Sequence, residues 1–486
     1  MTRLVVGPFN RVEGDLEVSL EVADGAVAAA YVNSPLYRGF EQILQGKAPE
    51  DALVIVPRIC GICSVAQSAA ATAALADVMG LTPAENGRLA SNLVLACENL
   101  ADHLTHFYLF FMPDFARPAY AAKPWFGAAR ERFQATVGTG ARHMLAARAD
   151  FMRLMGMLAG KWPHSLALQP GGSSRALQGA EQLQLRRLLR EFRAWLEKHL
   201  FGCPLEEIAG LDSRSALADW KAARPTASSD FRLFLEIAGE LELEALGRAT
   251  DVFLSYGAYA GAEGHLLPAG LWDGPAGGVL RPLDPAAIAE DVASAWYMDG
   301  GDGLHPSRGN TLPMADKPDA YSWCKAPRLG GRVVETGALA RQLVAGQPLL
   351  VQLVTEQGGS VFGRVLARLM EIARVLPEME RWVGAFEPRA PFCFQGVMPD
   401  EGEGSGLVEA ARGGLGHWLQ IRRGRLHSYQ IIAPTTWNFS PRDAAGQPGA
   451  LEQALVGVPV ADGEPAPLAI QHIVRSFDPC MVCTVH

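Results

Sequence analysis

Two Cys-x-x-Cys pairs near opposite ends of the 486-residue chain constrain its fold more than any other feature. Cys60 and Cys63 precede an alanine-rich run, and Cys480 and Cys483 lie close to the carboxyl end. Cysteines three positions apart share one face of a helical turn, and the positive end of a helix dipole favours thiolates over thiols. Four thiolates suit a soft metal, such as zinc, nickel or the iron of an iron–sulfur cluster. A fold that uses all four must bring the two ends of the chain together.

The simplest interpretation of four thiolates is a structural zinc site. Zinc ribbons usually close a loop of roughly 15 to 20 residues between their pairs, whereas most of this chain separates Cys63 from Cys480. A thioredoxin-like redox pair needs a strand–helix–strand context that neither pair has. The other cysteines stand alone, and we expect each to be a small buried hydrophobic residue. They are Cys97, Cys203, Cys324 and Cys393.

The composition excludes several classes of protein. Hydrophobic residues make up 49% of the chain and charged residues 20%, which is typical of a folded protein with a large core. The net charge of −9 and the scattered Lys and Arg residues disfavour nucleic-acid binding. No apolar run reaches the roughly 18 residues of a transmembrane helix, and the first residues carry no signal region. We therefore expect a cytoplasmic chain without a membrane span.

Hydrophobic patterning predicts a helix-rich α+β fold. Short alternating runs in about 1–35 indicate a small N-terminal β region. Helical spacing then predominates in a helical core, about 50–255 and 336–398. Within that core, helices are expected near 64–79, 87–112, 141–159, 176–200, 230–255, 336–345 and 360–384.

Two further segments depart from the helical pattern. The stretch of about 256–330 is rich in Gly, Pro, Asp and Trp, which predicts an irregular excursion with short strands. A C-terminal β/helix segment spans about 414–486, with strands expected at 416–421 and 426–433. The glycines that precede this segment, in 401–406, predict a loop.

The residues around the two cysteine pairs resemble a known family. Arg58-Ile-Cys-Gly-Ile-Cys63 and Asp478-Pro-Cys-Met-Val-Cys-Thr-Val-His486 are similar to the two signature motifs of NiFe-hydrogenase large subunits. Further likenesses follow in the family's order at 11–14, 38–41, 102–108, 411–413 and 433–438. The resemblance covers nearly the whole chain. It implies one large-subunit domain over 1–486, with a large central helical bundle and small peripheral sheets.

The resemblance implies a nickel–iron centre held by the four paired cysteines. Cys60 and Cys480 would be terminal nickel ligands, and Cys63 and Cys483 would bridge nickel to an iron that carries one carbon monoxide and two cyanides. The cyanide nitrogens need hydrogen-bond donors in a dry pocket. By the resemblance, the family's donor positions are occupied by Arg412, Thr435 and the backbone beside Pro434. Asp102 and Asp478 match carboxylates that can pair with this arginine.

A magnesium ion and a proton route are also implied. Glu41, His486 and the backbone carbonyl of Ile431 match the residues that hold magnesium near the centre, leaving room for the waters that magnesium prefers. In the family's mechanism H2 is cleaved heterolytically, a terminal thiolate, here Cys480, accepts the proton, and a carboxylate, here Glu13, relays it. A guanidinium is almost always protonated, so we expect Arg412 to position charge rather than to act as the base.

Three positions resemble the regulatory, hydrogen-sensing subgroup of this family. Gln67 stands where histidine is usual, Ile62 lies between the first two cysteines, and Phe110 occupies a position near the gas route. In that subgroup bulky side chains are expected to narrow the gas channel so that H2 passes more readily than oxygen, although plain core packing would explain Ile62 and Phe110 equally well. The chain stops at His486, as in the form made without a C-terminal extension. These features predict an H2 sensor that controls hydrogenase gene expression.

Partners and alternatives follow from the same residues. The chain has no further cysteine group that could hold an iron–sulfur relay, so an iron–sulfur small subunit is implied. A sensor would also engage a histidine kinase and form a higher oligomer. An energy-conserving uptake hydrogenase is the alternative within the family. Outside it stand a structural tetrathiolate zinc protein and a quinone-reductase subunit of the complex I type, which shares the fold but lacks the nickel cysteines.

Overall fold

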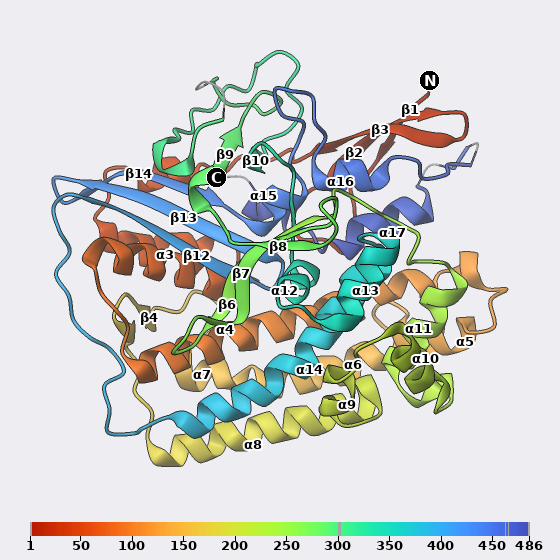
Figure 1. Ribbon diagram of the computed structural model, residues 1–486, viewed down its shortest axis with the longest axis horizontal. Coiled ribbons are helices and arrows are strands. Elements are labelled where there is room, and N and C mark those ends of the chain that lie inside the picture. Colours follow the sequence, from red (N-terminus) through yellow and green to blue (C-terminus); the bar gives the residue numbers. More distant parts are fainter. Residues whose placement is uncertain (1, 300–302, 462, 465, 485–486) are drawn as a thin grey trace.

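The computed structural model describes residues 2–299, 303–461, 463–464 and 466–484. The predicted N-terminal sheet is confirmed, with three antiparallel strands in the order β1-β2-β3. They are β1 (Thr2–Val6), β2 (Glu17–Ala23) and β3 (Ala26–Asn33). Val18 and Leu20 alternate along β2 and are fully buried, because one face of the sheet lies on the core. Figure 1 shows this sheet at the upper right.

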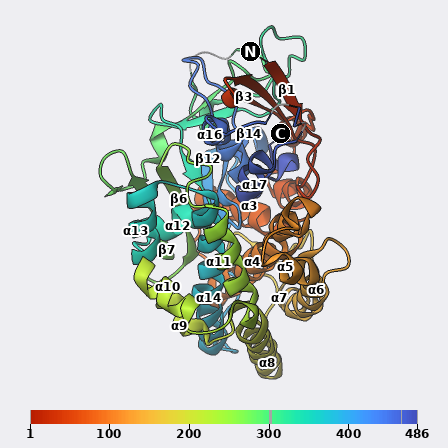
Figure 2. The same cartoon turned by 90° about the vertical axis from the view of Figure 1, so that its right-hand side faces the viewer.

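Helices form the lower part of the molecule in Figures 1 and 2. The longer ones are α3 (Ser64–Met79), α4 (Glu85–Thr105), α6 (Thr139–Phe151), α8 (Gly179–Trp195), α11 (Asp230–Glu240), α13 (Pro348–Gln357) and α14 (Val361–Ala385). The shorter ones are α1 (Phe40–Leu44), α2 (Ala52–Ile55), α5 (Phe126–Phe133), α7 (Arg153–Ala159), α9 (Leu205–Ala209), α10 (Arg214–Ala222), α12 (Ala338–Val344), α15 (Pro434–Asn438), α16 (Ala450–Leu455) and α17 (Leu468–Ser476). The helix predicted at 64–79 is confirmed with both bounds.

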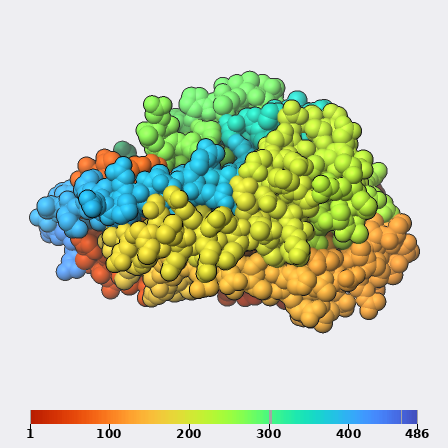
Figure 3. Space-filling model, turned by 90° about the horizontal axis from the view of Figure 1, so that it is seen from below, coloured from red at the N-terminus to blue at the C-terminus, as the bar shows by residue number. Residues whose placement is uncertain are grey.

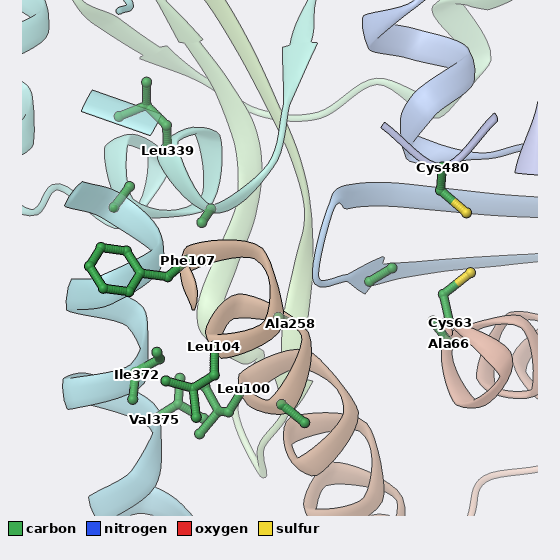
Figure 4. Packing of buried hydrophobic residues seen from close by; sticks show 14 of the residues in the cluster. Cys63, Ala66, Leu100, Leu104, Phe107, Ala258, Leu339, Ile372, Val375 and Cys480 are labelled. Carbon is green, nitrogen blue, oxygen red and sulfur yellow. The ribbon is translucent and has the colours of Figure 1, made fainter. Parts of the chain in front are cut away.

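The core of the helical bundle lies between α4 and α14. Leu100 and Leu104 of α4 face Ile372 and Val375 of α14, and all four side chains are buried (Figure 4). Helix α8 lies outside this pair, and Figure 3 shows it on the outer surface. None of the described helices is long and apolar enough to cross a membrane.

The helix predicted over 230–255 is wrong in its second half. Helix α11 ends at Glu240, and the chain continues as strand β6 (Val252–Ala260), which pairs with β7 (His265–Asp273). Nearly every residue of β6 is buried, so neither face shows the polar alternation of a half-exposed strand. Periodicity alone does not separate a strand buried on both faces from a buried helix.

The excursion predicted at 256–330 is therefore more regular than expected. Strands β6 and β7 belong to a four-stranded sheet in the order β11-β6-β7-β8. The remaining short strands are β4 (Leu168–Gln169), β5 (Gly172–Ser173), β8 (Val279–Arg281), β9 (Ile288–Asp291), β10 (Ala326–Leu329) and β11 (Glu335–Thr336). Between β8 and β10, the described residues are mostly turns and short bridges, as predicted.

The loop predicted at 401–406 is also wrong. It forms the start of β12 (Gly402–Ala410), which pairs with β13 (Gly413–Arg422) and, beyond it, β14 (Arg425–Ile432). Helix α3 packs so closely on β12 that a Cβ at Gly406 would lie 2.0 Å from the Ala70 carbonyl oxygen. The glycines therefore allow a helix to approach the strand rather than forming a turn. This packing places the start of α3, and with it the first cysteine pair, over the sheet.

Candidate metal centre

The structure brings the four paired cysteines together. Cys63 directly precedes α3, and Cys480 precedes a short 3₁₀ turn at Met481–Cys483. The Sγ atoms of Cys60 and Cys480 are 3.4 Å apart, those of Cys63 and Cys483 3.3 Å, and those of Cys480 and Cys483 3.0 Å. All four sulfurs lie within 4.8 Å of one another and belong to buried residues. In Figure 4 the sulfurs of Cys63 and Cys480 point toward each other.

The electrostatics of this cluster suit metal cations. Hydrogen bonds from Cys480, Cys483 and Cys63 hold the pKa of Cys60 well below its usual range. Contacts with Cys480 and Cys60, together with burial, raise the pKa values of Cys63 and Cys483 well above theirs. The protein alone therefore stabilises one thiolate at the expense of its neighbours. Four thiolates at these distances need soft metal cations between them, so the donor set fits a nickel–iron centre. The terminal and bridging roles stay predictions.

The N-terminal loop between β1 and β2 carries Glu13 to this cluster. The Glu13 N–H donates to the Pro479 carbonyl at 3.3 Å, and the Met481 N–H donates to the Glu13 carbonyl at 2.8 Å. Gly14, with φ +79°, permits the approach, because a Cβ there would lie 3.0 Å from the Val482 nitrogen. Burial and the charge of Cys60 raise the pKa of the Glu13 carboxyl. Glu13 is thus tied by its backbone to the residues on either side of Cys480.

Arg412 lies at the turn between β12 and β13 and contacts both predicted carboxylates. Its Nε donates to the Asp478 carbonyl at 2.9 Å, and its Nη2 donates to Asp478 Oδ1 at 3.1 Å. Its Nη1 is 3.1 Å from Asp102 Oδ2, an ion-pair contact without hydrogen-bond geometry. Burial lowers the pKa of Arg412, but Asp102 and Asp478 outweigh burial and raise it. The guanidinium stays protonated.

Orphaned donors around the cysteines provide a further test of fit. Among the described residues, Arg412 Nη1 and Gln67 Nε2 are buried without a hydrogen-bond partner. The Thr435 hydroxyl accepts from the Cys480 N–H at 3.0 Å and keeps its own hydrogen for another acceptor. Pro434 begins α15 one residue earlier. Buried donors of this kind match an acceptor such as the nitrogen of an iron-bound cyanide.

A polar chain that the sequence analysis missed holds Gln67. The His417 Nε2 lies 2.9 Å from Gln67 Oε1, and the His417 Nδ1 lies 2.8 Å from the Tyr429 hydroxyl. Burial lowers the pKa of His417 to about 3, so its ring is neutral. A single histidine in a strand-like run carries no sequence signal for such a contact.

Glu41, one of the predicted magnesium ligands, contacts a lysine that the sequence did not indicate. Glu41 is fully buried, accepts from the Ile431 N–H at 2.9 Å, and lies 3.0 and 3.1 Å from Lys325 Nζ. Lys325 also contacts Glu290, whose Oε1 has no hydrogen-bond partner among the described residues. A cavity of about 30 Å³ adjoins Lys325 and Glu290. His486 lies outside the described residues.

This arrangement fits a hydrated cation only in part. The cavity is large enough for one or two waters, which magnesium retains when it binds proteins. The Lys325 ammonium, however, already neutralises Glu41, so a magnesium ion would share or displace that contact. Magnesium therefore stays a prediction.

Neither of the two predicted gas-channel residues, Ile62 and Phe110, lines the cavity beside Lys325 and Glu290. Ile62 is partly buried, and its N–H donates to Cys60 Sγ at 3.3 Å. Phe110 is also partly buried, in the turn after α4, and its carbonyl accepts from Arg11. The channel role of both stays a prediction. Three isolated cysteines, Cys97, Cys203 and Cys324, are buried as expected, whereas Cys393 is partly exposed.

Comparisons with known proteins agree with this geometry. The sequence profile of the nickel-dependent hydrogenase family matches residues 38–137 and 235–486. The periplasmic [NiFeSe] hydrogenase large subunit of Desulfomicrobium baculatum is 31% identical over 100% of this chain and 95% of its own length. The uptake hydrogenase large subunit of Azotobacter chroococcum is 29% identical, with the same coverage. The solved structure of the reduced Ni-Fe-Se hydrogenase from D. vulgaris Hildenborough is 28% identical, with a TM-score of 0.85 over 100% of both chains. The chain therefore belongs to the nickel-dependent hydrogenase family, as one of its large subunits.

Proposed function

We propose that this chain is the active-site subunit of a cytoplasmic hydrogenase that cleaves H2 heterolytically and reports its presence. The observation that carries the catalytic part is the cluster of four buried sulfurs within 4.8 Å, drawn from both ends of the chain. Cys60, Cys63, Cys480 and Cys483 would hold nickel, with iron bridged through Cys63 and Cys483. When bound, the centre would supply the electrophile that polarises H2.

The surrounding residues divide the remaining tasks. The Cys480 thiolate would accept the proton from H2, and Glu13, anchored beside it through Pro479 and Met481, would carry the proton onward. The raised pKa of Glu13 brings its affinity for protons closer to that of a thiolate. Arg412 stays protonated and presents a fixed positive charge and a free Nη1 donor.

An infrared spectrum of the purified protein tests this assignment. A nickel–iron centre gives carbonyl and cyanide bands in a window where protein does not absorb, and metal analysis finds nickel and iron. A structural zinc protein gives one zinc, no nickel and neither band. That second result would withdraw the hydrogenase assignment.

The sensing role rests on Ile62, Gln67 and Phe110, which resemble the regulatory subgroup. The relatives described above include periplasmic and uptake enzymes, so an uptake role is the second candidate. Deleting the gene distinguishes a sensing role from an uptake role. Loss of a sensor alters expression of other hydrogenase genes in response to H2, whereas loss of an uptake enzyme removes H2 consumption. Cell fractionation tests the cytoplasmic location.

A small iron–sulfur subunit is the proposed partner, and exposed apolar residues support such a contact. Leu36, Ile43 and Val54, on segments leading to the first cysteine pair, are 44%, 47% and 41% exposed. Co-expression of the two subunits should give a complex that Ile43→Asp with Val54→Asp weakens. A kinase and a higher oligomer are proposed for the sensor on the same subgroup resemblance. Co-purification from native cells tests both.

A further inference from the structure

Glu98 is a buried carboxylate near the first cysteine pair, and the proposed proton route and metal ligands do not include it. Glu98 lies in the middle of α4 and is 3% exposed. Its Oε1 accepts from the Ala66 N–H at 2.9 Å, and its Oε2 accepts from the Val65 N–H at 2.9 Å. The Trp162 indole N–H also donates to Oε2, at 2.9 Å. The Ser64 hydroxyl donates to Oε2 as well, at 3.5 Å, so all four contacts are donors, the surroundings expected of a carboxylate rather than a neutral acid.

These contacts place Glu98 at the amino end of α3. The first N–H groups of a helix have no partner within it, and a neighbouring side chain usually caps them. Cys63 occupies the capping position of α3 but makes no capping hydrogen bond. Glu98 supplies the cap from another helix. Its charge therefore sits at the positive end of the helix that begins one residue after a predicted metal ligand.

Glu98 also fixes the segment that crosses the first cysteine pair. Trp162 donates to Glu98, and two residues later His164 Nδ1 lies 2.9 Å from the Pro57 carbonyl. Pro57 belongs to the turn just before Cys60. The His164 N–H also reaches Ser64 Oγ at 3.4 Å. One carboxylate thus links α3, α4 and the segment over the Cys60–Cys63 loop.

We propose that Glu98 is a positioning residue for the metal centre, which it serves in two ways. It holds the turn that carries Cys63, and its negative charge at the end of α3 makes the centre more electron-rich. The proposal rests on the nickel–iron assignment above. Burial raises the pKa of Glu98 to about 8, while the N–H groups of Val65, Trp162 and Ala66 lower it, so the carboxyl carries its full charge only well above pH 8.

The test is an infrared comparison of matched variants, recorded well above pH 8, where the Glu98 carboxyl is ionised. Glu98→Gln keeps the shape of the side chain and removes the charge, so less electron density reaches the iron and the carbonyl and cyanide bands move to higher wavenumber. Trp162→Phe removes one donor; at this high pH Glu98 keeps its charge, which is then less compensated, so the bands move to lower wavenumber. Glu85→Gln, at the exposed start of the same helix, leaves them in place.

Opposite shifts in the first two variants support the proposal. Bands at the parent positions in a metal-replete Glu98→Gln protein overturn it. If that variant does not retain metal, Trp162→Phe decides: a shift to lower wavenumber supports the role, and an unchanged spectrum overturns it. A parent protein without nickel or carbonyl bands would instead refute the proposed function and leave Glu98 as an ordinary helix cap.

Discussion

Replacing Gly406 by alanine should loosen the packing that holds the first cysteine pair. The new Cβ would lie 2.0 Å from the Ala70 carbonyl oxygen and 2.7 Å from the Ala74 nitrogen, both backbone atoms of α3. Real Cβ atoms do not approach closer than 3.0 Å, so helix and strand must separate by at least about 1 Å. Neither neighbour can rotate away. The cost should therefore reach about 3 kcal/mol, the upper part of the usual range for overpacking.

Two measurements follow from this estimate. An unfolding entropy of about 2.1 cal/mol/K per residue gives about 1 kcal/mol/K for the whole chain, so the thermal midpoint should fall by about 3 °C. Displacing α3 also moves Cys63, so the nickel content per chain should fall with the midpoint. Scanning fluorimetry and metal analysis measure the two effects.

Gly156→Ala provides the matched control. Gly156 lies inside α7, has no positive φ, and a Cβ there would meet nothing within 4 Å. Alanine at this position should stabilise the helix by about 0.5–1 kcal/mol. If Gly406→Ala retained the midpoint and nickel content of the Gly156→Ala protein, the close approach of α3 to β12 would not be what positions the cysteines.

Three further outcomes are expected. The Glu13→Gln protein should keep its metals but lose hydrogen–deuterium exchange and dye reduction. The activity of the parent protein should rise with pH as the Glu13 carboxyl ionises, above the usual pH range of a carboxyl, and the variant should lack this rise. Unchanged turnover would remove Glu13 from the proton route. Ile62→Val with Phe110→Leu should make the enzyme more sensitive to oxygen, and an unchanged inactivation rate would end the channel hypothesis. Elemental analysis should find one magnesium ion that Glu41→Gln removes, whereas a parent protein without magnesium would leave Lys325 as the counter-ion of Glu41.

The local sequence pattern predicted those helices and strands whose conformation depends on residues close by in the chain. Helix α3 follows from the alanine-rich stretch after Cys63, and both its bounds were predictable. The strand alternation of Val18 and Leu20 shows a one-sided sheet. Strands β6 and β12 were missed for the opposite reason. One is buried on both faces, and the other is glycine-rich because a helix from a distant segment lies on it.

The same division holds for the metal centre. The four cysteines, Glu13 and Arg412 belong to short motifs, so the sequence alone determined which donors could meet. Lys325, His417 and Glu98 lie in no motif, and only the tertiary structure decided that they contact Glu41, Gln67 and the end of α3. A buried polar group is specified by the partner that satisfies it. Because that partner comes from elsewhere in the chain, the folded structure alone can identify it.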